Sequence, residues 1–259
     1  MLRPRIVPCL LIHEGGLVKT VRFRDPTYVG DPINAVRIFN EKESDELVVL
    51  DIDASANGVE PDFKLIEHLA AECRMPLCYG GGVTTVDQAK RIISLGVEKV
   101  ALSSAAVANP DLISAIADSV GRQSTVVVID TRKRTFGSNY DVYTHNGTRK
   151  TGLAPTDFAQ QAEARGAGEI IVNSIDRDGT LKGYDVGLAR QMRAAVNTPL
   201  SFLGGAGRLE DIESLIREVG VVGASAGSLF VFKGKYRAVL INYPQPASKE
   251  ELVQRAMRA

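Results

Sequence analysis

The chain has 259 residues, 44% of them hydrophobic and 24% charged, which is enough to bury one full core, so a single domain spanning residues 1–259 is expected. Its 31 basic side chains balance 31 acidic ones, so no overall field exists to bind nucleic acid or an anionic membrane. Cys9, Cys73 and Cys78 lack metal-ligand spacing, and the N-terminal sequence has no secretion signal. We therefore expect a cytoplasmic protein whose pocket needs no metal and no cofactor.

Short apolar segments and amphipathic segments alternate along the whole chain. The apolar segments predict eight β-strands, at residues 5–11, 46–53, 76–82, 99–104, 125–130, 169–176, 199–205 and 219–227. Seven segments between them carry apolar residues three and four positions apart, which predicts helices. This alternation predicts a parallel sheet, and the fold class is α/β: a closed (βα)8 TIM barrel, with an open doubly wound sheet as the alternative.

The chain also contains an internal repeat. The glycine run at 80–82 corresponds to GGAG at 204–207, and the small-residue run at 103–107 corresponds to the one at 225–230. The order of the matches is the same in both parts, as expected for a duplicated half-barrel. We predict half-barrels at about residues 1–122 and 123–245, followed by a C-terminal tail at about 246–259.

In each half of the chain, two predicted strands end in glycine or serine residues. Glycine at these positions lets an oxyanion approach the backbone N–H groups. The bland interpretation is that these glycines only allow tight turns. Because the two sets occur at matching positions of the repeat, we predict two phosphate sites, at Gly80, Gly81, Gly82, Ser103 and Ser104 in the first half and at Gly204, Gly205, Gly227 and Ser228 in the second.

Several longer motifs resemble a known family. RIVPCL, GDPINAVRIFN, VYTHNGTRKTG and NSIDRDGT, in this order, resemble the cyclase (HisF-type) subunit of imidazole glycerol phosphate synthase from end to end. The resemblance implies a lyase of histidine biosynthesis that works in a glutamine amidotransferase complex. A glutaminase subunit (HisH-type) would dock on the N-terminal barrel face, and its ammonia would pass along the axis to a doubly phosphorylated substrate.

Four charged residues each stand at the first residue of a predicted strand: Arg5, Glu46, Lys99 and Glu169. Side chains alternate along a strand, so Arg5 shares an inward face with the residues two and four positions later. The resemblance implies an ammonia gate formed by these four positions. The alternative is four strand-start charges that face water.

One position departs from the family pattern. Members that close the imidazole ring carry an aspartate where this chain has Leu11, paired with the residue matching Asp130 as general acid and base. Two carboxyl groups can divide these roles because their surroundings separate their pKa values, and leucine can take neither role. Asp130 is therefore the remaining catalytic candidate, and otherwise it would only cap a loop.

Other substrate positions of the family are filled by Lys19, Asp51, Asp178 and Gly179. Lys19 lies in an expected loop after the first strand, where Gly15 and Gly16 could hinge a lid. In histidine-pathway enzymes, asparagine usually stands at the position of Ser103 and threonine at that of Asn173. His145 is a further candidate ligand contact.

Three functional interpretations follow. With leucine at position 11, the chain resembles a branch of the family associated with lipopolysaccharide and other surface-polysaccharide pathways. That resemblance implies a barrel that mainly channels ammonia toward a separate ATP-dependent sugar amidotransferase, which makes an acetamidino sugar. The second is an ordinary cyclase in which another group replaces the missing aspartate. The third, the sister isomerase of the same pathway, also requires paired aspartates and gives no reason for a gate.

Overall fold

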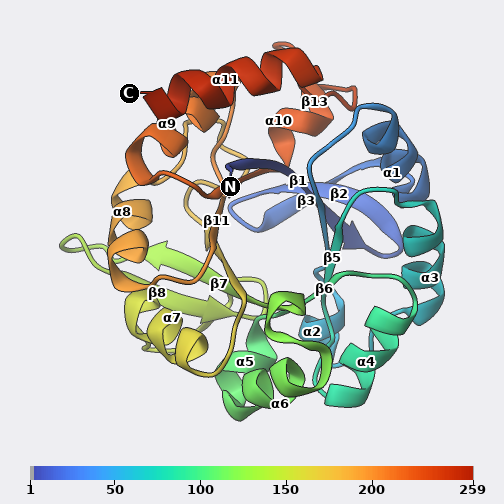
Figure 1. Cartoon of the computed structure of the whole chain (residues 1–259), viewed down its shortest axis with the longest axis vertical. Helices are drawn as coiled ribbons and strands as arrows, with labels where there is room; N and C mark the ends of the chain where they lie inside the picture. Colours follow the sequence, from blue (N-terminus) through green and yellow to red (C-terminus); the bar gives the residue numbers. More distant parts are fainter. Residues whose placement is uncertain (1–2, 259) are drawn as a thin grey trace.

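The computed structural model describes residues 3–258 of the chain. Eight parallel strands form a closed barrel, because the last of them pairs with the first (Figure 1). The predicted TIM barrel is confirmed and the open sheet is wrong. Around the barrel the strands are β1 (Arg5–His13), β4 (Leu47–Asp51), β5 (Leu77–Gly80), β6 (Lys99–Leu102), β7 (Thr125–Lys133), β10 (Glu169–Ser174), β11 (Leu200–Leu203) and β12 (Gly223–Ala226).

Helices surround the barrel, and each of the seven predicted helical segments contains one. Local signals start them: the Asp31 side chain accepts a hydrogen bond from the Asn34 N–H, and Thr85 and Gln88 form a capping box. Residues 246–258, expected only as a tail, form a helix that packs beside α9. The helices are α1 (Pro32–Glu41), α3 (Phe63–Glu72), α4 (Val86–Ser94), α6 (Asp111–Val120), α7 (Pro155–Ala164), α8 (Val186–Ala195), α9 (Leu209–Val219) and α11 (Pro246–Arg258), with a 3-10 turn η1 (Arg122–Ser124).

Alternating strand residues separate two cores. On β1, Ile6 and Leu10 face the helices and join the large outer core, whereas Val7 and Cys9 face the barrel axis. The inner core is a buried, mainly aliphatic cluster of Val7, Cys9, Val48, Cys78, Ala101, Val126, Val128, Ile171 and Leu203. The barrel interior is thus packed between its two ends.

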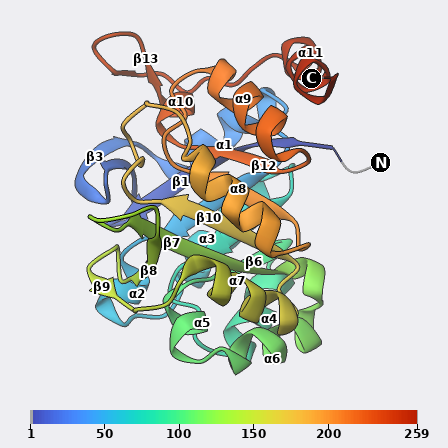
Figure 2. The same cartoon turned by 90° about the vertical axis from the view of Figure 1, so that its left-hand side faces the viewer.

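Small elements decorate the mouth, by which we mean the end of the barrel at the C-termini of its strands (Figure 2). The segment expected as a hinged loop after β1 is instead a β-hairpin paired with β1. Glu14 and Gly15 both have positive φ, 48° and 76°, as a two-residue hairpin turn of the right twist requires. The elements are β2 (Gly16–Val21), β3 (Arg24–Gly30), α2 (Ala54–Asn57), α5 (Ser104–Ala108), β8 (Tyr140–Thr144), β9 (Arg149–Lys150), α10 (Ser228–Val231), β13 (Phe232–Lys233) and β14 (Ala238–Val239).

No helix within residues 3–258 is long and apolar enough to cross a membrane.

Candidate active site

The predicted substrate residues meet in one cavity at the mouth. The cavity holds about 1230 Å³ of empty space, including its open entrance. Leu11 and His145 also line the cavity. Its lining includes Lys19, Asp51, Gly80, Gly81, Gly82, Ser103, Ser104, Asp130, Asn173, Asp178, Gly179, Gly204, Gly205, Gly227 and Ser228.

The two glycine sets face each other across this cavity, because β5 and β11 lie four strands apart around the barrel. Close backbone packing explains the glycines locally. A Cβ atom at Gly81, where φ is +123°, would lie 2.4 Å from the Asp51 carbonyl oxygen, and one at Gly205 would lie 2.2 Å from the Gly183 carbonyl oxygen. The turn geometry therefore requires glycine whether or not a phosphate binds, and the same bare turns leave backbone groups uncovered at the cavity wall.

Leu11 and Asp130 stand on opposite walls of the mouth, because β1 and β7 are also four strands apart. Asp130 Oδ1 accepts a hydrogen bond of 3.0 Å from Asn173 Nδ2, and Oδ2 accepts one of 3.5 Å from Ser103 Oγ. Burial raises the pKa of Asp130 to about 7, although both hydrogen bonds favour the charged form. Asp130 lies within β7, so it does not cap a loop.

The raised pKa predicts a measurable titration. We expect the protonated carboxyl group of Asp130 to persist up to about pH 7, visible as an infrared C=O band that Asp130→Asn removes. Between pH 4 and 7 the folded state then holds a proton that the unfolded state has lost. The contribution of this group to stability must fall as pH rises through that window and level off above it. A band lost by pH 5, or no stability difference between the two proteins across the window, would contradict this assignment.

The β2–β3 hairpin seals one side of the mouth. Asp178 Oδ2 accepts hydrogen bonds from Thr20 Oγ1 at 2.7 Å and from the Phe23 N–H at 3.1 Å. Lys19, on β2, is buried and donates to the Cys9 carbonyl oxygen, and burial lowers the pKa of its ammonium group. A Cβ atom at Gly227 would lie 2.6 Å from Lys19 Nζ, so the cation reaches the second glycine set.

Asp51 lines the cavity and also stabilises the backbone that follows β4. Its Oδ1 accepts hydrogen bonds from the backbone N–H groups of Asp53 and Ala54 at the start of α2. The His145 N–H donates to Ser104 Oγ at 3.3 Å, which ties the β8–β9 turn to the first glycine set.

Several residues that line the cavity were missed by the sequence analysis, among them three polar side chains and one aromatic ring. Thr20 and Phe23 enter with the unpredicted hairpin, Ser55 with the short helix α2, and Asn146 with a turn of positive φ. The HNG sequence at 145–147 is a recognisable turn signal and could have identified Asn146. Thr20 and Phe23 had no such signal, because only the hairpin fold brings them to Asp178.

At the opposite end of the barrel, Arg5, Glu46, Lys99 and Glu169 form what we call the charged ring. Lys99 Nζ contacts Glu46 at 2.6 Å and Glu169 at 2.7 Å. Arg5 bonds the same two carboxylates, with 2.7 Å to Glu169. The Glu46 and Glu169 side chains are only 5% and 6% exposed. The ring residues therefore point toward the barrel axis and not into water. The sequence analysis placed Glu46 at the first residue of the second strand, but β4 begins at Leu47, so Glu46 directly precedes the strand.

The electrostatics of the charged ring favour the ionised forms of Lys99 and Glu169, whereas burial and the nearby Glu169 carboxylate raise the pKa of Glu46. Burial opposes the charge on Lys99, but Glu169 and Glu46 outweigh it and raise the Lys99 pKa. Burial likewise opposes the charge on Glu169, and Arg5 and Lys99 outweigh it and lower its pKa. Ser201 Oγ donates a further hydrogen bond of 2.5 Å to Glu169. Within residues 3–258, no group of three or more His, Cys, Asp or Glu side chains could hold a metal ion.

Known proteins are similar to this chain over nearly its whole length. Residues 5–237 match the family model described as "Histidine biosynthesis protein". A Vibrio vulnificus protein with the provisional name imidazole glycerol phosphate synthase subunit hisF3 is 57% identical, covering 98% of both chains. The imidazole glycerol phosphate synthase subunit HisF of Hyphomonas neptunium is 42% identical, covering 90% of this chain and 91% of its own. The chain belongs to the histidine biosynthesis protein family, as a HisF-type subunit of the imidazole glycerol phosphate synthase group.

Proposed function

We propose that this chain receives ammonia from a HisH-type glutaminase on its N-terminal barrel face and carries it along the barrel axis. The ammonia then serves the amidination of a bacterial surface-polysaccharide sugar, while ring closure in the barrel itself is impaired. The observation that carries this proposal is Leu11, an apolar side chain on the wall opposite Asp130.

The charged ring supports the receiving step. The ring has four buried or partly buried charges of alternating sign. Its side chains can exchange ion-pair partners, so the ring can open and close without leaving any charge unpaired. Above the ring, the mainly aliphatic inner core offers a small neutral molecule no competing charge. A neutral ammonia molecule can enter such a region far more easily than an ammonium ion, because burying an unpaired ion is costly.

The mouth supports weak ring-closing chemistry. Asp130, with a pKa of about 7, can exchange one proton at neutral pH. Ring closure by an acid–base pair needs a second group on the far side of the substrate, and Leu11 cannot donate or accept a proton. Loss of one such group costs a factor of about 10²–10⁴.

The nitrogen acceptor is proposed from the resemblance to the branch that lacks the strand-one aspartate. In that interpretation an ATP-dependent sugar amidotransferase uses the ammonia. The second candidate function is authentic cyclisation in histidine biosynthesis, which is favoured by the retained Asp130, by Lys19 and by the two glycine sets in one cavity.

An isotope experiment tests the proposal. The chain, its glutaminase, the ATP-dependent amidotransferase of the same genome and its sugar substrate are combined with ¹⁵N-amide glutamine and excess unlabelled ammonium. We expect the label to enter the amidinated sugar. Parallel incubation with the histidine-pathway intermediate should give imidazole glycerol phosphate only slowly. Rapid cyclisation near a typical kcat of ~10 s⁻¹, with no label in the sugar, would favour the second function.

A further inference from the structure

Exposed apolar side chains gather at the mouth. Of the eleven large hydrophobic residues that are exposed among residues 3–258, nine lie in connections that follow the C-terminal ends of barrel strands. Phe136 and Tyr236, in the β7–β8 and β13–β14 hairpins, are 89% and 91% exposed. Single exposed apolar residues are ordinary, but their concentration on one face is typical of an interaction surface. The nine are Val21, Tyr28, Val59, Phe136, Leu153, Leu181, Tyr236, Val239 and Leu240.

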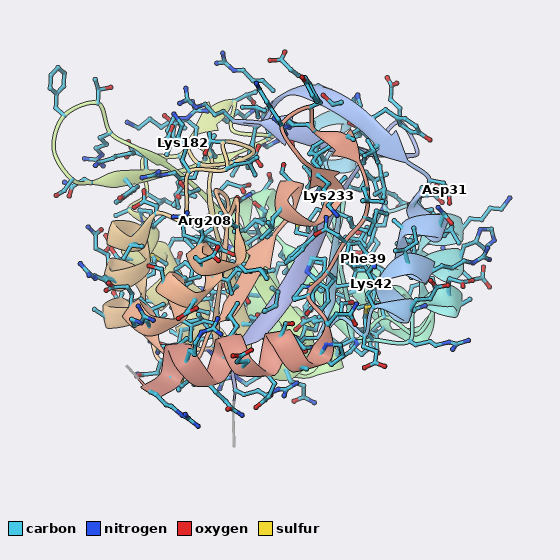
Figure 3. The ribbon with its side chains drawn as sticks, turned by 90° about the horizontal axis from the view of Figure 1, so that it is seen from above. Asp31, Phe39, Lys42, Lys182, Arg208 and Lys233 are labelled. Atoms are coloured by element: carbon cyan, nitrogen blue, oxygen red, sulfur yellow. The ribbon has the colours of Figure 1, made fainter. Side chains whose placement is uncertain are left out.

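Charge is unevenly distributed around the same face. Residues 132–150 contain five Lys or Arg side chains and one acidic residue, Asp141, which already bonds Arg134 and Lys150 at 2.7 Å each. Residues 232–240 contain three basic side chains and no acidic one, whereas residues 53–62 contain three acidic and no basic ones. Because the whole chain is neutral, this pattern is a local property of the mouth. In Figure 3, Lys182 and Lys233 lie toward the mouth, away from α11.

The proposed function creates a need for a cover. If Leu11 prevents consumption of ammonia inside this barrel, the ammonia must leave through the mouth. Ammonia that reaches bulk water is protonated and lost as a nucleophile. The enzyme that consumes the ammonia must therefore exclude water from the open cavity. Only a protein docked over the entrance can do this while the ammonia leaves.

We propose that the mouth is the docking surface for the ATP-dependent amidotransferase that consumes the ammonia. The hairpins carrying Phe136 and Tyr236 follow β7 and β12, which lie three strands apart, so a partner that contacts both must span the cavity. The docking surface of that enzyme is acidic opposite these two hairpins and has apolar pockets for the two rings. Aromatic side chains of this kind are common anchors of interfaces that bury about 1,200–2,000 Å². This inference rests on the proposed function.

A binding experiment with a matched control tests the surface. The complex of this chain with its glutaminase is titrated with the purified amidotransferase, and the Kd is compared among wild type, Phe136→Ser/Tyr236→Ser and Val221→Ser/Met257→Ser. The last pair changes the two exposed apolar residues that lie away from the mouth connections. We expect the mouth variant to raise Kd by at least ~10-fold and the control to leave it unchanged. Glutaminase binding should not change in the mouth variant, and the midpoint of thermal unfolding should not change in either variant.

Photo-crosslinking locates the contact independently. A benzophenone amino acid at position 136 or 236 should form adducts with the amidotransferase, and one at position 221 should not. Labelled nitrogen transfer that continues with unchanged Kd and without adducts at 136 and 236 would overturn the docking surface while leaving the proposed function intact. Adducts and a weakened Kd without nitrogen transfer would keep the interface and refute the proposed function. Adducts only with a second copy of this chain would also overturn the inference.

Discussion

Replacing Leu11 with aspartate is expected to raise the rate of imidazole ring closure by about 10²- to 10⁴-fold. The new carboxyl group would stand on β1 across the mouth from Asp130, whose pKa of about 7 already suits proton exchange at neutral pH. Two carboxyl groups in different surroundings can then act as acid and base in one step. The measurement is the steady-state formation of imidazole glycerol phosphate from the histidine-pathway intermediate with saturating ammonium.

The matched control is Leu11→Asn, which has nearly the same shape as aspartate and cannot transfer a proton. Any gain from improved polarity or space would appear in both variants, whereas a gain from proton transfer would appear only with aspartate. Adding Asp130→Asn to Leu11→Asp should remove the gain. If Leu11→Asp matches wild type, the cavity no longer holds this substrate productively, and the lost aspartate alone does not explain the lost activity.

Removing one charge from the charged ring is expected to destabilise the protein strongly. Glu169→Gln leaves Arg5 and Lys99 facing Glu46 as the remaining anion of the ring. Breaking a buried ion pair on one side typically costs 3–5 kcal/mol, and because Arg5 and Lys99 stay partly exposed we expect about 3 kcal/mol. Urea unfolding at pH 7 measures the change as a lower midpoint with an unchanged slope.

Two controls separate the ring from a general effect of losing a carboxylate. Glu72→Gln breaks an exposed ion pair with Arg37 and should change stability little, because water screens such a pair. The double variant Glu169→Gln/Lys99→Met restores charge balance around Arg5 and Glu46 and should recover part of the loss. Equal stability of Glu169→Gln and Glu72→Gln would show that the ring contributes no more than a surface pair.

Much of the architecture could be predicted from the sequence because it depends on local patterns. Buried strands between covering helices must be apolar, so the eight apolar segments marked every barrel strand. The missed hairpin after β1 has a different cause. Its turn is formed by Glu14 and Gly15. β2 is mostly buried, but its apolar residues Leu17 and Val18 are adjacent rather than alternating, and β3 is polar and largely exposed. Alternation of apolar residues therefore gave no sign of either strand.

By itself, the sequence determined the order of the eight barrel strands and of the seven helices between them, the identity of the four ring residues and the absence of a carboxylate at position 11. Only the tertiary structure decided that β12 pairs with β1, and closure of the barrel is what makes Arg5, Glu46, Lys99 and Glu169 neighbours. It also decided the pKa of Asp130, because burial is a property of everything packed around a residue. Local patterns fix which face of a strand is buried, whereas contacts between residues more than a hundred positions apart depend on how the whole sheet closes.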